Sequence, residues 1–154
     1  MSCLGHGLIG NGWPVLPLCW TDDGGECACG RHHPTKSAGK APLTRNGSKD
    51  ATTDSGQVDY WASRWPDANW GVACGAVTAL DIDDAALASQ LKKDQRLIAE
   101  HFMVATPRGN GLHIYLIEEN PTKRTRILIS QDGQHIGEIR RAGSYVVGPG
   151  SQIA

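Results

Sequence analysis

The chain has 154 residues, of which 40% are hydrophobic and 20% charged, and its formal net charge is −1. This length suffices for one domain with a buried core, and the balance of charge is not the strongly basic one of a non-specific DNA-binding protein. No apolar run is long enough to cross a membrane, and the N-terminus lacks the features of a signal peptide. We therefore expect a cytoplasmic protein.

Positive charge is nevertheless clustered along the sequence. Basic residues gather within 31–49 and 123–126, and Arg140 and Arg141 form a third group. Local basic patches can exist on a neutral protein. Each cluster is therefore either a solvated loop or part of a binding surface.

The N-terminal half predicts short elements around a long loop. Residues 2–12 are expected to form a short helix, and residues 13–18 a strand at a sheet edge, because two prolines exclude a central position. The stretch 19–50 is too long for a loop without a functional or structural role, so we expect a metal or a ligand to hold it in place. Asp54 is expected to cap a helix that ends before Pro66 and turns an aromatic stripe toward the core.

The C-terminal half predicts one long helix among strands. Strands are expected at 69–73 and 77–82, and the longest helix at 84–101, capped by Asp83 or Asp84. Its apolar face would comprise Leu87, Leu91, Ile98 and Phe102. Further strands are expected at residues 103–106, 112–117, 127–130, 134–141 and 144–147. Helices mixed with antiparallel-looking strands predict the α+β class.

Asp81 and Asp83 stand one residue apart at the end of the strand expected at 77–82. Because alternate side chains of a strand point to the same face, both carboxylates would face away from Leu80 and Ile82. Two carboxylates this close repel each other unless a cation lies between them. Hard oxygen ligands suit Mg²⁺ or Mn²⁺, so the pair predicts a platform for metal-assisted phosphoryl chemistry.

Later strands carry residues that could complete a site around this pair. His113 and Tyr115 would share one face of their strand, and Glu138 and Arg140 one face of theirs. If both strands pair with the acid-bearing strand, three acids, one imidazole and one guanidinium could meet around a triphosphate. Arg108, in the glycine-containing turn before the first of these strands, is a further candidate for phosphate.

Cysteine and histidine residues cluster in the 19–50 loop. They supply the nitrogen and sulfur ligands that tetrahedral zinc takes, and an odd number of cysteines in an intracellular chain favours metal over disulfide. The candidate zinc ligands are Cys19, Cys27, Cys29 and either His32 or His33. Cys3 and Cys74 are interpreted as apolar residues, although Cys3 could approach the site. The alternative is a reduced, metal-free loop.

Three motifs follow one another in the chain: Leu-Asp-Ile-Asp at 80–83, Thr-Pro-Arg-Gly-Asn-Gly-Leu-His-Ile-Tyr at 106–115, and Gly-Glu-Ile-Arg-Arg-Ala-Gly-Ser-Tyr-Val-Val at 137–147. In their order and spacing they resemble the catalytic motifs of the bifunctional DNA primase/polymerase N-terminal domain, in the archaeo-eukaryotic primase superfamily. The resemblance runs through nearly all of the sequence. It includes the earlier segments 12–18 and 39–54.

The resemblance implies a single domain over 1–154, with an RNA-recognition-motif-like catalytic sheet over the motifs at 77–149, an N-terminal α/β part and a zinc-type insertion. It also implies template-directed nucleotidyl transfer, with a DNA template and primer and nucleoside triphosphates as partners. By this likeness two Mg²⁺ or Mn²⁺ ions would be bound by Asp81, Asp83 and Glu138. The nucleotide phosphates would be contacted by His113, with Arg108, Arg140 and Lys40 as weaker candidates.

The family normally continues beyond the segment that ends at Ala154, so we expect a domain that is C-terminally truncated relative to it. A helicase or other replication protein is an expected partner, in replication of a mobile element or phage, in repair or in defence. One alternative is a catalytically silent or partner-dependent relative that binds nucleotide or single-stranded nucleic acid. Others are a metal-dependent nuclease and a zinc-stapled interaction module.

Overall fold

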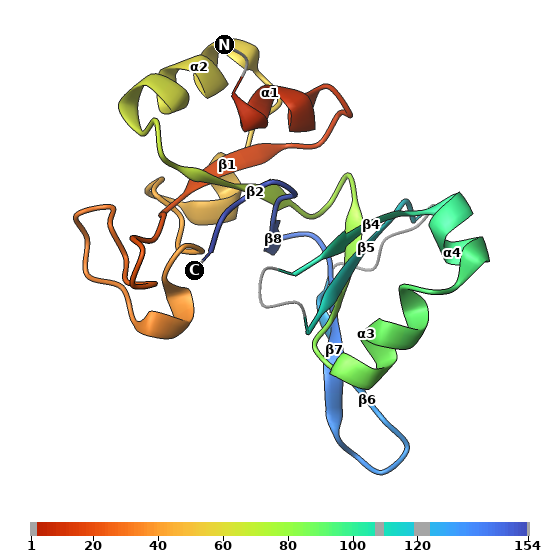
Figure 1. The fold of residues 1–154 in the computed structure, drawn as a ribbon. Helices are drawn as coiled ribbons and strands as arrows, with labels where there is room; N and C mark the ends of the chain where they lie inside the picture. Colours follow the sequence, from red (N-terminus) through yellow and green to blue (C-terminus); the bar gives the residue numbers. More distant parts are fainter. Residues whose placement is uncertain (1–2, 107–109, 119–123, 154) are drawn as a thin grey trace. The chain divides into compact units, whose positions relative to one another are not determined.

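The computed structural model describes residues 3–106, 110–118 and 124–153. The chain divides into two compact units: unit 1 comprises Met1–Ala73 and Tyr145–Ala154, and unit 2 comprises Cys74–Ser144. Each unit contains helices and one antiparallel sheet, which confirms the α+β class (Figure 1). Among the described residues, no helix combines the length and apolar character needed to cross a membrane.

Unit 1 is built on a three-stranded antiparallel sheet. Its strands are β1 (Val15–Leu18), β2 (Asn69–Ala73) and β8 (Tyr145–Val147), with β2 in the centre. Helices α1 (Leu4–Ile9) and α2 (Ser55–Arg64) lie together over this sheet (Figure 1). Pro17, in β1, therefore lies at a sheet edge, as predicted, and Pro14 directly precedes this strand.

Both faces of this sheet are covered. Gly5 brings α1 against Trp70 and Val58, since a Cβ at this position would lie 3.0 Å from both side chains. On the other face, Leu16 and Leu18 are buried, and Ala51, directly after the stretch 19–50, packs against their cluster. The carboxylate of Asp54 accepts a hydrogen bond of 2.7 Å from a backbone N–H in the first turn of α2, which confirms the predicted cap.

The long loop of unit 1 carries two short 3-10 helices, η1 (Thr35–Ser37) and η2 (Gly47–Asp50). Asn69 fastens this loop, because its amide nitrogen donates to the carbonyl oxygens of Gly39 at 3.0 Å and Cys19 at 3.3 Å. The same side chain donates to the carbonyl of Gln152 at 2.7 Å and accepts from its backbone N–H at 2.8 Å. One buried amide thus joins β2, the loop and the C-terminal segment.

Unit 2 contains a five-stranded antiparallel sheet with β3 in its centre. Its strands, in spatial order, are β4 (Phe102–Ala105), β5 (Leu112–Leu116), β3 (Thr78–Ile82), β7 (His135–Arg140) and β6 (Arg126–Ile129). Residues of helices α3 (Ala85–Leu91) and α4 (Gln95–Glu100) pack against residues of this sheet (Figure 1). The buried core on the helical side comprises Ile82, Ala88, Leu112 and Ile114, with partly buried leucines around it.

The single long helix predicted for residues 84–101 is wrong, because the segment forms two helices. Asp84 caps the first helix, and Asp94 caps the second by accepting two hydrogen bonds, of 2.9 and 3.1 Å, from backbone N–H groups of its first turn. This second cap begins a separate helix, α4. As a result, Ile98 is 49% exposed and Phe102, in β4, is 50% exposed, so neither joins the apolar face assigned to them.

Candidate functional site

The strand register of unit 2 brings three of the candidate residues together. Asp81 in β3 lies directly opposite His113 in β5 and directly opposite Glu138 in β7. Directly opposed residues of antiparallel strands project from the same face of a sheet. The condition set by the sequence, that both late strands pair with the acid-bearing strand, is therefore met.

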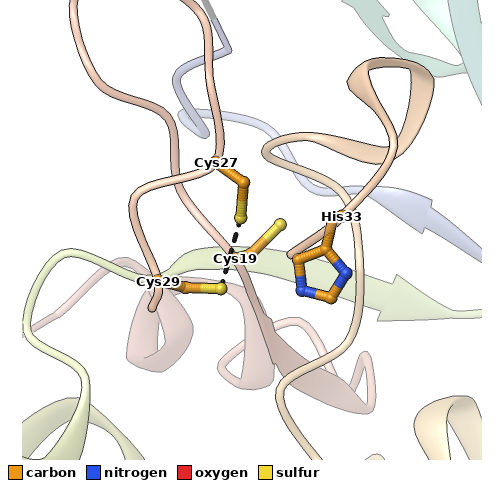
Figure 2. A group of neighbouring side chains, drawn as sticks. All are labelled: Cys19, Cys27, Cys29 and His33. Carbon is orange, nitrogen blue, oxygen red and sulfur yellow. Dashed lines mark hydrogen bonds between the residues drawn. The ribbon is translucent and has the colours of Figure 1, made fainter. Parts of the chain in front are cut away.

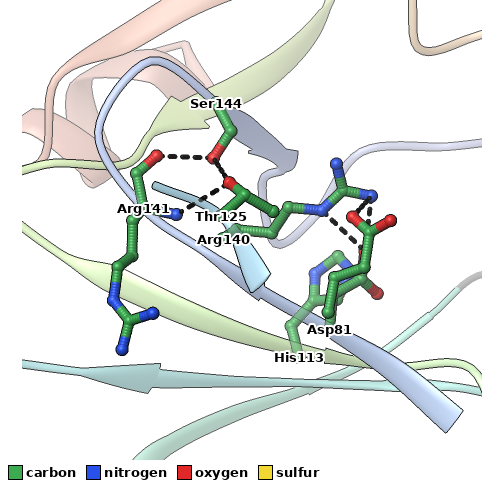
Figure 3. Close-up of polar contacts among 7 residues, drawn as sticks. Asp81, His113, Thr125, Arg140, Arg141 and Ser144 are labelled. Carbon is green, nitrogen blue, oxygen red and sulfur yellow. Dashed lines mark hydrogen bonds and ion pairs between the residues drawn. The ribbon is translucent and has the colours of Figure 1, made fainter. Parts of the chain in front are cut away.

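A network of charged groups forms around Asp81 (Figure 3). His113 Nε2 lies 3.2 Å from Asp81 Oδ1, and Arg140 donates to Asp81 Oδ2 from both Nε and Nη2 at 3.3 Å. Arg140 Nη2 also lies 2.8 Å from Glu138 Oε2, so one guanidinium bridges the two acids. Burial alone would raise the pKa of Asp81, but His113 and Arg140 outweigh it and hold this pKa below its usual value.

The two acids that follow β3 have different surroundings. Asp84 Oδ1 accepts the backbone N–H of Leu87 at 2.7 Å and caps α3, which settles the choice left open between Asp83 and Asp84. Asp83 is exposed, and no hydrogen bond or ion pair engages its carboxylate within the described part of the chain. This side chain is therefore available for an external ligand.

Gly137 is a residue of this site that the sequence reasoning did not single out. It pairs with Ile82, and a Cβ at this position would collide with the carbonyl oxygen of Asp81. Only glycine therefore lets β7 approach β3 closely enough to set Glu138 beside Asp81. A glycine inside an otherwise regular strand pattern, one residue before a candidate acid, was the available signal.

Arg141 has a structural role, unlike its neighbour Arg140. It is 9% exposed and forms two hydrogen bonds to Glu118, of 2.9 and 2.7 Å, which lower the pKa of that carboxyl. Its backbone contacts Thr125 and Ser144 (Figure 3). The Arg140–Arg141 pair is therefore engaged with acids and does not form a free basic patch.

Two candidates for nucleotide binding are not tested by this geometry. Arg108 lies outside the described residues. Lys40 belongs to unit 1, where its carbonyl oxygen accepts a hydrogen bond of 2.9 Å from the hydroxyl of Tyr145. A role in nucleotide binding stays a prediction for both.

A second cluster lies in the long loop of unit 1. The ligand atoms of Cys19, Cys27, Cys29 and His33 all lie within 4.8 Å of one another (Figure 2). Across the described residues, no other group of three or more acids, cysteines and histidines converges in this way, and Asp81, Asp83 and Glu138 form no such group. Of the two histidines left open by the sequence, the structure places His33 in the cluster, and Cys3 is not part of it.

The chemistry of this cluster fits zinc. Its three sulfurs and one imidazole nitrogen are a Cys₃His ligand set. His33 Nε2 is buried and has no hydrogen-bond partner among the described residues, which is the state of a ligand nitrogen that is reserved for a metal. Burial raises the pKa of the Cys29 thiol in the metal-free cluster, and a bound cation would instead favour the thiolate.

The sequence of this chain matches the model of a known protein family. No curated protein matches the chain. A family model described as "Bifunctional DNA primase/polymerase, N-terminal" matches residues 6–154.

Proposed function

Because the chain belongs to the bifunctional DNA primase/polymerase N-terminal family, we propose that it catalyses template-directed nucleotidyl transfer. The 3′-hydroxyl of a primer would attack the α-phosphate of a nucleoside triphosphate, a new phosphodiester bond would form and pyrophosphate would leave. The observation that carries this proposal is the register that sets Asp81 opposite both His113 and Glu138.

The acids would hold divalent cations. Asp81, Asp83 and Glu138 offer the hard oxygen ligands that suit Mg²⁺ or Mn²⁺. Such ions, when bound, lower the pKa of the attacking hydroxyl and stabilise the negative charge of the leaving group. Burial does not protonate Asp81, because His113 and Arg140 hold its pKa below its usual value, so at neutral pH it is the carboxylate that a metal ligand must be.

Arg140 and His113 would bind negatively charged groups, first the acids of the site and then the phosphates of the nucleotide. Arg140 pairs with both Asp81 and Glu138 in the metal-free protein, and a third of its side chain is exposed. Cations bound by the acids would free this guanidinium for the triphosphate, which it can bind with two parallel hydrogen bonds. His113 holds Asp81 through Nε2, which orients the carboxylate. By family likeness its imidazole would also contact the nucleotide phosphates.

Primer extension tests this proposal. A labelled primer on a DNA template is incubated with nucleoside triphosphates and Mg²⁺ or Mn²⁺, and Asp81→Asn/Asp83→Asn is compared with wild type. Asparagine keeps the shape of both side chains but removes the charge that binds cations. We expect extension by wild type and a loss of at least a hundredfold in the double variant. Glu100→Gln, an exposed acid at the end of α4, is the matched control.

A second candidate function is a catalytically silent or partner-dependent relative that binds nucleotide or single-stranded nucleic acid. Two observations favour it. Arg140 forms ion pairs with both Asp81 and Glu138, and these two acids do not converge with Asp83 on one point. Metal-dependent nucleotide binding without any extended product would support this alternative. Shortening of the labelled primer without nucleotides would instead favour the metal-dependent nuclease.

We also propose that Cys19, Cys27, Cys29 and His33 hold a structural zinc ion. Four protein ligands leave no open coordination position, which is typical of structural sites and not of catalytic ones. A zinc ion here would hold the 19–50 loop, which Asn69 also anchors. We place the family activity in replication of a mobile element or phage, or in repair or defence, with a helicase or another replication protein as partner.

A further inference from the structure

Unit 1 contains a cavity that the proposed reaction does not use. The cavity has a volume of about 1000 Å³ and lies along α2, the segment 43–54 and Arg31 of the long loop. We call it the α2 cavity, and the lining residues that matter to the argument are Arg31, Arg45, Tyr60, Arg64 and Trp65. All of them belong to unit 1, whereas the acids of the candidate active site belong to unit 2.

The charges of the α2 cavity favour an anionic ligand. Arg31, Arg45 and Arg64 are exposed, and none of them forms an ion pair with an acid of the described residues. Two acids also line the cavity, but their carboxylates are engaged locally. Asp54 caps α2, and Asp50 accepts two hydrogen bonds from Asn46, of 2.8 and 3.0 Å. The three guanidinium groups outnumber the two carboxylates, so the lining carries a net charge of +1 (three minus two), and the hydrogen bonds to Asp50 and Asp54 hold these acids in local contacts.

Aromatic rings lie among these arginines. Tyr60 is 55% exposed, although the neighbouring Trp61 is buried at 6% and serves the core. Trp65 is partly exposed, and the guanidinium of Arg64 lies 5.3 Å from the centroid of its ring. Exposed rings between cations are the combination that binds single-stranded nucleic acid, with bases stacked on the rings and phosphates on the cations.

We propose that the α2 cavity binds a single strand of nucleic acid. Its volume is at the upper end of the roughly 300–1,000 Å³ that small-molecule sites span, so it accommodates more than one nucleotide. Arg31, Arg45 and Arg64 bind successive phosphates, and Tyr60 and Trp65 stack against bases. The choice of a DNA template as the strand rests on the proposed function, whereas binding of the strand itself does not.

Fluorescence anisotropy with a labelled oligo-dT tests this proposal, without added nucleotides or magnesium. Arg45→Ala/Arg64→Ala should bind at least tenfold more weakly than wild type, and its log K against log salt slope should fall by about 0.7 for each lost phosphate contact. Tyr60→Ala should bind about 5- to 160-fold more weakly with an unchanged salt slope, because stacking carries no charge. The matched control is Lys93→Ala/Arg96→Ala, which removes two exposed charges from unit 2.

Equal weakening in the control and in Arg45→Ala/Arg64→Ala would overturn the proposal, since binding would then depend on net charge alone. Displacement of the oligonucleotide by millimolar dTMP would also overturn it, because the cavity would then be a mononucleotide site. Asp81→Asn/Asp83→Asn should bind oligo-dT like wild type. A protein that binds the strand but extends no primer therefore refutes the proposed reaction and leaves the α2 cavity assignment standing.

Discussion

Replacement of Asn69 by alanine should be among the most destabilising single changes in unit 1. The side chain is 6% exposed and lies at the start of β2. Its amide nitrogen donates to the carbonyls of Gln152, Gly39 and Cys19 at 2.7, 3.0 and 3.3 Å, and its oxygen accepts from the Gln152 N–H at 2.8 Å. Alanine removes all of these contacts and leaves the backbone groups without this partner.

The expected loss follows from these contacts. Two N–H groups shared by three carbonyls make about two full hydrogen bonds, and the carbonyl oxygen of the side chain makes a third. At a net ~1 kcal/mol each, Asn69→Ala should lower the free energy of unfolding by about 3 kcal/mol. For a chain of this size that corresponds to a fall of about 6–12 °C in Tm.

Urea unfolding at a fixed zinc concentration measures this effect, because metal binding shifts apparent stability. The matched control is Asn11→Ala, in which an exposed asparagine loses one hydrogen bond of 3.1 Å to a helix carbonyl. The control should change the free energy of unfolding by less than about 0.5 kcal/mol. If both variants lose the same small amount with unchanged m-values, Asn69 does not fasten the loop and the argument from its buried contacts is wrong.

Four further outcomes are expected. Cys27→Ser should lower zinc content by mass spectrometry from one ion per chain to near zero, whereas Cys74→Ser should retain it; equal zinc in both would remove the metal assignment. Gly137→Ala should reduce primer extension at least tenfold, because its Cβ collides with the Asp81 carbonyl, and unchanged extension would contradict that geometry. Because the pKa of Asp81 is depressed in the folded protein, its contribution to the free energy of unfolding is complete above about pH 4 and is lost as pH falls through the lower folded-state pKa. The free energy of unfolding of Asp81→Asn, followed as pH is lowered, should therefore lack this step. Arg141→Met should lower the urea midpoint of unfolding, because it leaves Glu118 without its bidentate partner, and an unchanged midpoint would refute the structural role.

Features that depend on neighbours in the sequence were predictable. The strand expected at residues 69–73 has the same bounds as β2, and the Asp54 cap follows from a side chain that reaches a backbone N–H three residues later. The division of the segment 84–101 into two helices depends on a competing cap at Asp94. The helical spacing of the segment predicts one continuous helix, although the aspartate at position 94 is also a possible N-cap for a second helix.

The candidate site was predictable in its residue types and only partly in its contacts. Strand alternation placed His113 on one face of its strand and Glu138 on one face of the other, but it could not fix the pairing of those strands with β3. The adjacent residues Arg140 and Arg141 look alike in the sequence. The structure separates them, because one bridges two acids near Asp81 and the other binds Glu118 in a nearly buried position.

The sequence by itself determined the α+β class, the family and the residues capable of metal and phosphate chemistry, because periodicity, caps and motifs are local properties of the chain. Tertiary structure alone decided which of these residues meet. The register of β3, β5 and β7 set Asp81 between His113 and Glu138, and the path of the long loop selected His33 over His32 for the cysteine cluster. Both results depend on contacts between residues far apart in the sequence, which sequence spacing does not specify.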